Sequence, residues 1–352
     1  MNIFIVNKLR KTPVYDVYWR FAAERQNIFF NRLLRKEAPW TMDPVLAKYK
    51  FTNTYRVLDR VSQFLIRNII NPDGESKLTD EDKIFRILLF KIFNKIETWQ
   101  LLETSLGDIS WNQYSFQEYD RVLSAAFSDG ISIYSAAYIM ASGKSMYSCE
   151  RKHQNHLKLL EHMMKSHITM RITSAYSMAQ LYDVLKSYPL VGPFLAYQYA
   201  IDINYSGMTD FSEEDFVIAG PGARDGIAKC FTDSGSYSDE DIIRVMMENQ
   251  QAEFRRLGLE FKNLFGRPLQ LIDCQNLFCE VGKYARVSHP EIKDKSGRMK
   301  IKQVYRSSGD ISEPSFPGKW GLSPAVQTFL NTHQIETGGT WRKNATLWGD
   351  IS

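Results

Sequence analysis

The sequence has 352 residues, of which 44% are hydrophobic, 24% charged and 13% aromatic, so disordered, collagen-like and coiled-coil classes are excluded. The four cysteines have no closely paired spacing, which excludes a disulfide framework and a zinc or iron–sulfur ligand set and favours a reducing, cytoplasmic setting. The formal net charge is only +4, but it is distributed unevenly. Residues 1–70 carry 13 Lys and Arg against 5 Asp and Glu, and residues 281–306 carry 8 against 2. The two basic segments either meet on one face, where they would attract a polyanion, or form two separate solvated faces.

Helical periodicity dominates the chain from residue 14 onward, because apolar side chains return every three or four residues. The predicted helices cover 14–37, 54–70, 81–94, 96–105, 116–126, 152–165, 176–187, 193–204, 239–256 and 269–285. Strand-like runs are few and short, at Met1 to Val6 and at Met299 to Val304. The sequence therefore predicts a mainly α fold, with a helical body over 1–286 and an irregular basic segment over 287–352 packed on that body.

The most informative stretch is a helix–hairpin–helix unit at about 181–231. One predicted helix ends before Pro189, and the next begins at Pro193 after a turn that contains Leu190, Val191 and Gly192. The unpaired N–H groups at the start of the second helix can bind a phosphate. Such helix pairs are also a common packing element of all-α proteins, so the motif alone does not establish DNA binding.

A candidate catalytic carboxylate, Asp215, lies 23 residues after Gly192. It precedes the turn Gly220-Pro221-Gly222, whose glycines permit close approach of the backbone to a ligand. The alternative is Asp202, on the helix after the hairpin, which is either catalytic or a buried helix-packing carboxylate.

The segments PLVGPFLA and EDFVIAGPGA resemble the helix–hairpin–helix DNA glycosylase superfamily. The resemblance implies that the hairpin grips a DNA phosphate and that Asp215 stabilises the sugar cation as the base leaves. Bifunctional members carry a Schiff-base lysine shortly after the hairpin glycine, where this chain has Pro193 and Phe194, so the resemblance implies a monofunctional enzyme or a different reaction. The residues expected at the DNA backbone are Leu190, Val191, Gly192, Gly220, Gly222, Lys283 and Arg286.

Six segments also resemble the helical family described as α-glutamyl/putrescinyl thymine pyrophosphorylases, which is considered a divergent branch of the glycosylase fold. They are 51–66, 88–99, 133–143, 192–206, 216–227 and 273–286. The resemblance covers about residues 50–286. It implies action on hypermodified phage DNA, either by attaching amino groups to phosphorylated hydroxymethyl bases or by excising glucosylated hydroxymethylcytosine.

Polar and aromatic side chains in these segments are expected to form a base and sugar pocket. Arg56 and Arg60 lie one helical turn apart, so they would share a face suited to a phosphate, unless they are surface or ion-paired arginines. The alternative for the polar residues of the last predicted helix is a network that holds this helix in place. The alternative for the tyrosines is a position in the core. The expected pocket residues are Asn53, Arg56, Arg60, Tyr197, Gln198, Gln275, Asn276 and Glu280.

The favoured function is a monofunctional DNA glycosylase that flips and excises a base such as glucosylated hydroxymethylcytosine from phage DNA, as an anti-phage defence. Its partner would be double-stranded DNA that carries modified bases, with no metal, cofactor, membrane or obligatory protein partner. The first alternative is a transferase that displaces pyrophosphate from a phosphorylated hydroxymethyluracil in DNA, and the second is a non-catalytic protein that binds modified DNA. The chain contains no Gly-rich nucleotide loop, which argues against a self-contained kinase or ATPase.

Overall fold

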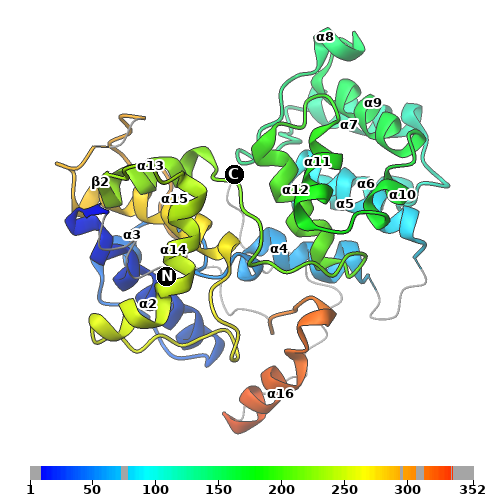
Figure 1. Cartoon of the computed structure of the whole chain (residues 1–352). Helices are drawn as coiled ribbons and strands as arrows, with labels where there is room; N and C mark the ends of the chain where they lie inside the picture. Colours follow the sequence, from blue (N-terminus) through cyan, green and yellow to red (C-terminus); the bar gives the residue numbers. More distant parts are fainter. Residues whose placement is uncertain (1–8, 73–77, 294–295, 307–312, 334, 336–352) are drawn as a thin grey trace. The chain divides into compact units, whose positions relative to one another are not determined.

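The computed structural model describes residues 9–72, 78–293, 296–306, 313–333 and 335, which are mainly helical, as the sequence predicts (Figure 1). The chain divides into two compact units that interleave along the sequence. Unit 1 comprises Met1–Asp59, Glu213–Pro314 and Leu322–Ser352, and unit 2 comprises Arg60–Ser212 and Ser315–Gly321. The predicted boundary at residue 286 falls inside a helix of unit 1.

Unit 1 contains the long helices α2, α14 and α15, together with shorter helices and two short strands. β1 pairs antiparallel with β2, and the predicted strand at Met1 to Val6 lies outside the described residues. The elements are β1 (Arg10–Lys11), α2 (Pro13–Leu33), α3 (Pro44–Lys48), η1 (Arg56–Leu58), α13 (Pro221–Cys230), β2 (Phe231–Asp233), α14 (Asp239–Arg256), α15 (Leu271–Ser288) and α16 (Ser323–Thr332).

Local signals in the sequence explain where these helices begin. Thr12 caps α2 through a 3.1 Å hydrogen bond from the Val14 N–H to its hydroxyl, and Pro13 occupies the first helical position. In α15 the Gln270 N–H donates to Asp273 Oδ2 at 3.0 Å, which satisfies an N–H group that the helix leaves unpaired. C-terminal residues pack on α2, since the Phe329 ring of α16 lies 5.6 Å from that of Phe30.

The closest helix packing in unit 1 depends on glycines (α13 and α15, Figure 1). A Cβ atom on Gly226 would lie 1.9 Å from the Phe278 carbonyl oxygen, and a Cβ on Gly222 would lie 2.4 Å from Cys279 Sγ. These glycines therefore allow α13 to approach the backbone of α15. The turn predicted at Gly220-Pro221-Gly222 is wrong. Gly220 is the N-cap of α13, a helix that the apolar periodicity did not predict.

Unit 2 is a helical body in which α12 is buried along most of its length and packs against α5 and α11. Predicted helices at 81–94, 96–105, 116–126, 152–165, 176–187 and 193–204 are confirmed with small shifts of their ends. The elements are α4 (Arg60–Phe64), η2 (Leu65–Ile70), α5 (Asp80–Phe93), α6 (Ile96–Leu106), α7 (Phe116–Ser128), α8 (Lys144–Tyr147), α9 (Lys152–Lys165), α10 (Ile168–Thr173), α11 (Met178–Lys186), α12 (Pro193–Tyr205) and η3 (Gly318–Trp320).

The single helix predicted at 54–70 is wrong. Residue Asp59 has extended backbone angles (φ −69°, ψ 144°) and ends the 3₁₀ helix η1, after which α4 and the π-helix η2 follow. Arg86 of α5 binds the end of η2, because its guanidinium donates to the carbonyls of Asn68 at 2.8 Å and Ile69 at 2.9 Å. Arg56 and Arg60 thus belong to different elements and do not share one helical face.

No described helix combines the length and the apolar composition that crossing a membrane requires.

Candidate functional site

The two basic segments of the sequence come together in unit 1. The Lys50 N–H donates to the Gln303 carbonyl at 3.0 Å, and the Tyr305 N–H donates to the Lys48 carbonyl at 2.9 Å. We call this pairing, residues 48–50 with 302–306, the basic bridge. The strand predicted at Met299 to Val304 is not formed. Val304 forms only an isolated antiparallel β-bridge with Tyr49.

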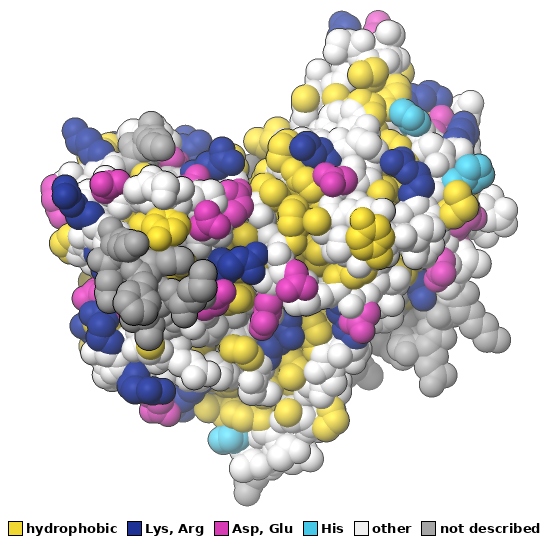
Figure 2. Space-filling model, viewed as in Figure 1, with side chains coloured by type: hydrophobic (Ala, Val, Ile, Leu, Met, Phe, Trp, Pro, Cys, Tyr) yellow, Lys and Arg dark blue, Asp and Glu magenta, His cyan; other side chains and the backbone are white. Residues whose placement is uncertain are grey.

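The basic bridge presents cations to solvent, since Lys48, Lys302 and Arg306 are exposed. On the face that Figure 2 shows, dark blue Lys and Arg side chains alternate with magenta Asp and Glu side chains over the elements of unit 1. The positive charge on that face is therefore interspersed with negative charge.

A polar cluster, which we call the Asp59 cluster, fixes segment 52–59 against α15. The Thr52 N–H donates to Glu280 Oε2 at 2.9 Å, and Asn276 Nδ2 donates to Thr52 Oγ1 at 3.1 Å. Within the segment, the Asn53 N–H donates to Asp59 Oδ1 at 2.7 Å. The sequence-predicted residues Asn53, Asn276 and Glu280 are thus assembled in one place.

Two basic side chains extend this cluster. Arg25 of α2 donates its Nε–H to the Thr52 carbonyl at 3.0 Å, and Lys283 Nζ lies 2.8 Å from Glu280 Oε2. Lys283 also lies 4.6 Å from the centre of the Phe51 ring. The cations Arg25 and Lys283 and the carboxylates Asp59 and Glu280 therefore surround segment 52–59.

Desolvation raises the pKa of Asp59 from 3.8 to about 7, although the Asn53 N–H, Arg56 and Arg25 act in the opposite direction. Glu280 raises the pKa further, because two nearby carboxylates disfavour each other's charge. A carboxylate that titrates near neutral pH can accept a proton or a hydrogen bond under physiological conditions, as functional carboxylates do.

Asp273 also has a pKa raised to about 7 by desolvation. Its two oxygens, however, accept hydrogen bonds from the N–H groups of Gln270 and Arg56, at 3.0 and 2.8 Å. Asp273 therefore joins the start of α15 to the start of η1 and serves the fold.

The eight residues predicted to form one base and sugar pocket are divided between the units. Those in unit 1 are Asn53, Arg56, Gln275, Asn276 and Glu280. Those in unit 2 are Arg60, Tyr197 and Gln198. Arg56, Tyr197 and Gln198 are buried, whereas Arg60 forms an ion pair with Glu97 at the surface of unit 2. Arg60 thus fits the ion-paired alternative, whereas Arg56 is buried and shares no phosphate-binding face with it.

Asp202 of unit 2 forms a buried ion pair with Lys91, with 2.9 Å between Oδ2 and Nζ and side-chain exposures of 1% and 2%. The Lys91 ammonium also donates to Asn94 Oδ1 at 2.8 Å and lies 4.6 Å from the centre of the Tyr138 ring. Removing one partner of such a pair leaves an uncompensated buried charge. The pair therefore favours the helix-packing alternative for Asp202.

The predicted hairpin is present between α11 and α12. Leu190 adopts a left-handed conformation (φ 67°), Val191 is buried, and Gly192 is exposed at the N-cap of α12. A Cβ on Gly192 would meet no described atom within 4 Å, so a ligand could approach this backbone closely. The hairpin lies in unit 2, whereas the exposed Asp215 lies in unit 1 in the loop before α13.

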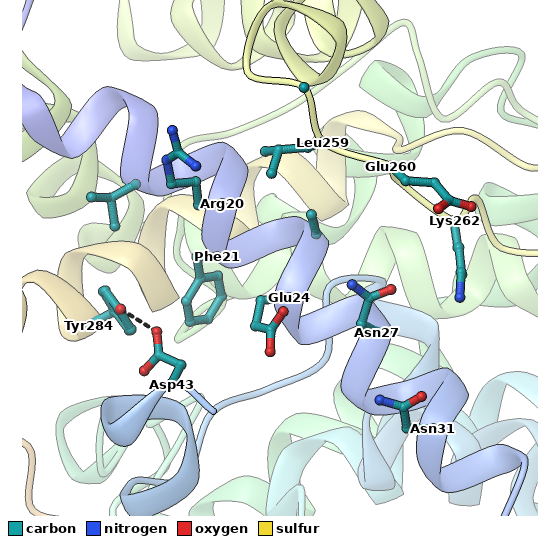
Figure 3. Close-up of a pocket in the computed structure, with 13 residues that line it drawn as sticks. Arg20, Phe21, Glu24, Asn27, Asn31, Asp43, Leu259, Glu260, Lys262 and Tyr284 are labelled. Carbon is teal, nitrogen blue, oxygen red and sulfur yellow. Dashed lines mark hydrogen bonds between the residues drawn. The ribbon is translucent and has the colours of Figure 1, made fainter. Parts of the chain in front are cut away.

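One pocket of unit 1 lies beside α2 and has a volume of about 670 Å³ (Figure 3). Its walls carry Arg20 and Lys262 but also the carboxylates of Glu24, Asp43 and Glu260. The Asp43 carboxylate accepts a 2.6 Å hydrogen bond from the Tyr284 hydroxyl. This mixture of charges gives the pocket no preference for an anion.

Three contributors to the Asp59 cluster were not predicted as site residues from the sequence. Thr52 and Asp59 lie in segment 51–66, one of the six segments that carry the family resemblance. That resemblance is the sequence signal that could have identified them as site residues. Arg25 lies on a separate helix, and only the fold brings it to the Thr52 carbonyl.

The model of the family described as "5-hmdU DNA kinase, helical domain" matches residues 12–294. The chain belongs to this family. A protein of Bacillus phage SP10 named 5-hmdU DNA kinase is 28% identical over 301 residues, which are 79% of this chain and 46% of that protein. The chain therefore spans about half the length of this curated relative. No solved structure gives a significant match.

Membership of the 5-hmdU DNA kinase helical-domain family corrects the identity and the function expected from the sequence. The attribution to DNA glycosylases and their pyrophosphorylase-like branch is wrong, as are the predicted base flipping, base excision and hydrolase class. Neither alternative function gains support from the match. The role expected of Asp215, which was to stabilise the sugar cation during base excision, therefore no longer applies. The error arose because the hairpin, a local motif, is compatible with many helical folds.

The sequence contains no Walker A motif. Gly143-Lys144-Ser145 has the last three residues of that motif, but Tyr138 stands where the first glycine is required. The helix that follows, α8, has only four residues. This segment therefore does not form a P-loop.

Proposed function

We propose that this chain is the DNA-binding helical module of an enzyme that phosphorylates 5-hydroxymethyluracil bases in DNA. The observation that carries the proposal is the match of the 5-hmdU DNA kinase helical-domain model over residues 12–294. In such a reaction the hydroxymethyl oxygen attacks the γ-phosphorus of a nucleoside triphosphate, the diphosphate leaves, and a base takes the hydroxyl proton. The chain lacks a Walker A motif, so we assign it the DNA substrate and no P-loop for the triphosphate.

Each unit offers an element suited to the DNA backbone. In unit 1 the basic bridge supplies Lys48, Lys302 and Arg306, whose exposed cations can replace the counterions of phosphates. In unit 2 the exposed Gly192 is the N-cap of α12, and N–H groups at a helix start favour a phosphate. Backbone contacts position the protein on DNA but carry no information about the modified base.

Asp59 is the residue that we assign to the hydroxymethyl group. The C5 substituent of a thymine-type base projects into the major groove, so its hydroxyl is accessible while the base remains paired. A half-buried carboxylate with a pKa of about 7 accepts a strong hydrogen bond from a hydroxyl when it is ionised, and can take up the proton during transfer. Asp202 is less suitable because it is buried and paired with Lys91.

The test compares binding of two duplexes that differ only in one base, 5-hydroxymethyluracil or thymine, by fluorescence anisotropy between pH 6 and pH 8.5. We expect about tenfold tighter binding of the modified duplex at pH 8, since a hydrogen bond to a charged group contributes roughly 1.5–3 kcal/mol. The preference should decrease as the pH falls through about 7, because Asp59 becomes protonated.

Asp59→Leu should remove the preference at every pH while binding to the thymine duplex is retained. Asp215→Asn is the matched control, since it changes an exposed carboxylate of the same unit and should keep the preference. Equal affinities for the two duplexes at pH 8, or release of the modified base, would refute the proposal. Lys302→Gln should weaken binding of both duplexes equally and reduce the salt slope by about one.

A further inference from the structure

A second pocket of unit 1, with a volume of about 360 Å³, lies between α2 and the basic bridge. Its walls are largely apolar, and aromatic rings come from four positions: Trp40, Tyr49, Phe51 and Tyr305. The cations in its wall are Arg25 and Arg32 of α2, and none of the described residues that line it is a carboxylate. Its size and mostly apolar lining, with a few polar groups, are typical of a small-ligand site.

The polar groups of this pocket are held in place by their surroundings. Arg25 is anchored through its Nε–H to the Thr52 carbonyl, and although desolvation lowers its pKa to about 10, it stays charged at neutral pH. The Arg32 guanidinium lies 5.0 Å from the centre of the Trp40 ring. Two charged forks in an apolar wall favour a bidentate oxyanion such as a phosphate.

The Tyr305 hydroxyl provides a second, independent indication. It is buried and forms no hydrogen bond with any described residue. Such groups are rare in folded proteins because their desolvation is uncompensated, so a polar partner from a ligand or solvent is expected. Tyr305 itself belongs to the pocket wall.

We propose that this pocket binds one nucleotide, with the heteroaromatic ring among the aromatic side chains and the phosphate at Arg25 and Arg32. Aromatic stacking and arginine–phosphate pairing are the two interactions that such a ligand requires. The pocket of Figure 3 lacks this combination, because carboxylates of Glu24, Asp43 and Glu260 line it. The inference is independent of the proposed function and leaves two sources for the nucleotide, a free nucleoside phosphate or an unpaired stretch of a DNA strand.

The experiment is isothermal titration of the full chain with dTMP, ATP, thymidine, inorganic phosphate and a short oligo(dT) strand. We expect dTMP or ATP to bind at least about tenfold more tightly than thymidine or phosphate alone, because ring and phosphate are recognised together. Binding of oligo(dT) without binding of the free nucleotides would identify the strand as the source. Failure of the nucleotides and of the strand to bind at up to about 10 mM would overturn the proposal.

Two substitutions test whether binding occurs in this pocket. Tyr305→Phe keeps the ring and removes only the hydroxyl, and should weaken binding about three- to tenfold. Arg32→Gln should weaken it more than about tenfold. Arg20→Gln, an exposed position on the same helix outside this pocket, should bind like the unsubstituted chain. Unchanged nucleotide affinity in both pocket variants refutes the assignment. Duplex binding through the basic bridge should persist in Arg32→Gln, which lies outside the bridge, and this separates the result from a failure of the proposed function.

Discussion

Replacement of Asp59 by Asn should stabilise the protein at alkaline pH. The pKa of Asp59 is about 7 in the folded protein and 3.8 in the absence of its surroundings, so folding favours the protonated, neutral form. The stability that this preference provides is complete below pH 3.8 and is lost as the pH rises through about 7. Asn is neutral at every pH, and its side-chain oxygen can still accept the Asn53 N–H.

The size of the effect follows from the shift. About three pKa units at 1.36 kcal/mol each set an upper bound of about 4 kcal/mol, which solvent screening of a half-buried group reduces to about 2–3 kcal/mol. Wild type and Asp59→Asn should therefore be similarly stable at pH 4, and the variant should gain its advantage between pH 4 and pH 7.5.

Urea unfolding at half-unit steps from pH 4 to pH 8.5 measures this difference, with the exposed Asp215→Asn as the matched control. The reasoning is refuted if Asp59→Asn is less stable than wild type at pH 8, or if the difference between them does not change with pH. A stabilised variant that also loses the pH dependence of its preference for hydroxymethyluracil would show that the carboxylate is kept for function at the expense of stability.

Three further substitutions test the packing and the polar contacts. Arg86→Met should lower the unfolding free energy by about 3–5 kcal/mol in urea unfolding, because the carbonyls of Asn68, Ile69 and Ile109 lose their donor; the exposed Arg121→Met should change it by less than about 0.5 kcal/mol. Gly226→Ala should cost at least about 1–3 kcal/mol by thermal denaturation, since its Cβ would meet the Phe278 carbonyl, whereas Gly192→Ala should be nearly neutral for stability. His156 has a pKa lowered to about 4 by desolvation, and its neutral ring donates to the Ala141 carbonyl and accepts from the Tyr134 hydroxyl. Its contribution is present above pH 6.5 and lost as the pH falls toward 4, so in urea unfolding wild type should lose up to about 3 kcal/mol relative to His156→Gln over this range.

The sequence alone determined most helices, because their apolar periodicity and their caps are local properties. Thr12 and Pro13 begin α2, and the hairpin ending at Gly192 separates α11 from α12 as predicted. The basic composition of 1–70 and 281–306 was equally visible, since charge is read directly from the residues.

The tertiary structure decided what these local signals could not. The backbone of Asp59 breaks a helix that apolar spacing alone makes continuous, and α13 forms because Gly226 can pack against the backbone of α15, a contact that spacing does not encode. Arg25, Thr52 and Glu280 are far apart in the sequence and meet only because α2 and α15 pack in one unit. Site chemistry depends on such long-range contacts, and burial, which sets the pKa of Asp59, exists only in the folded chain.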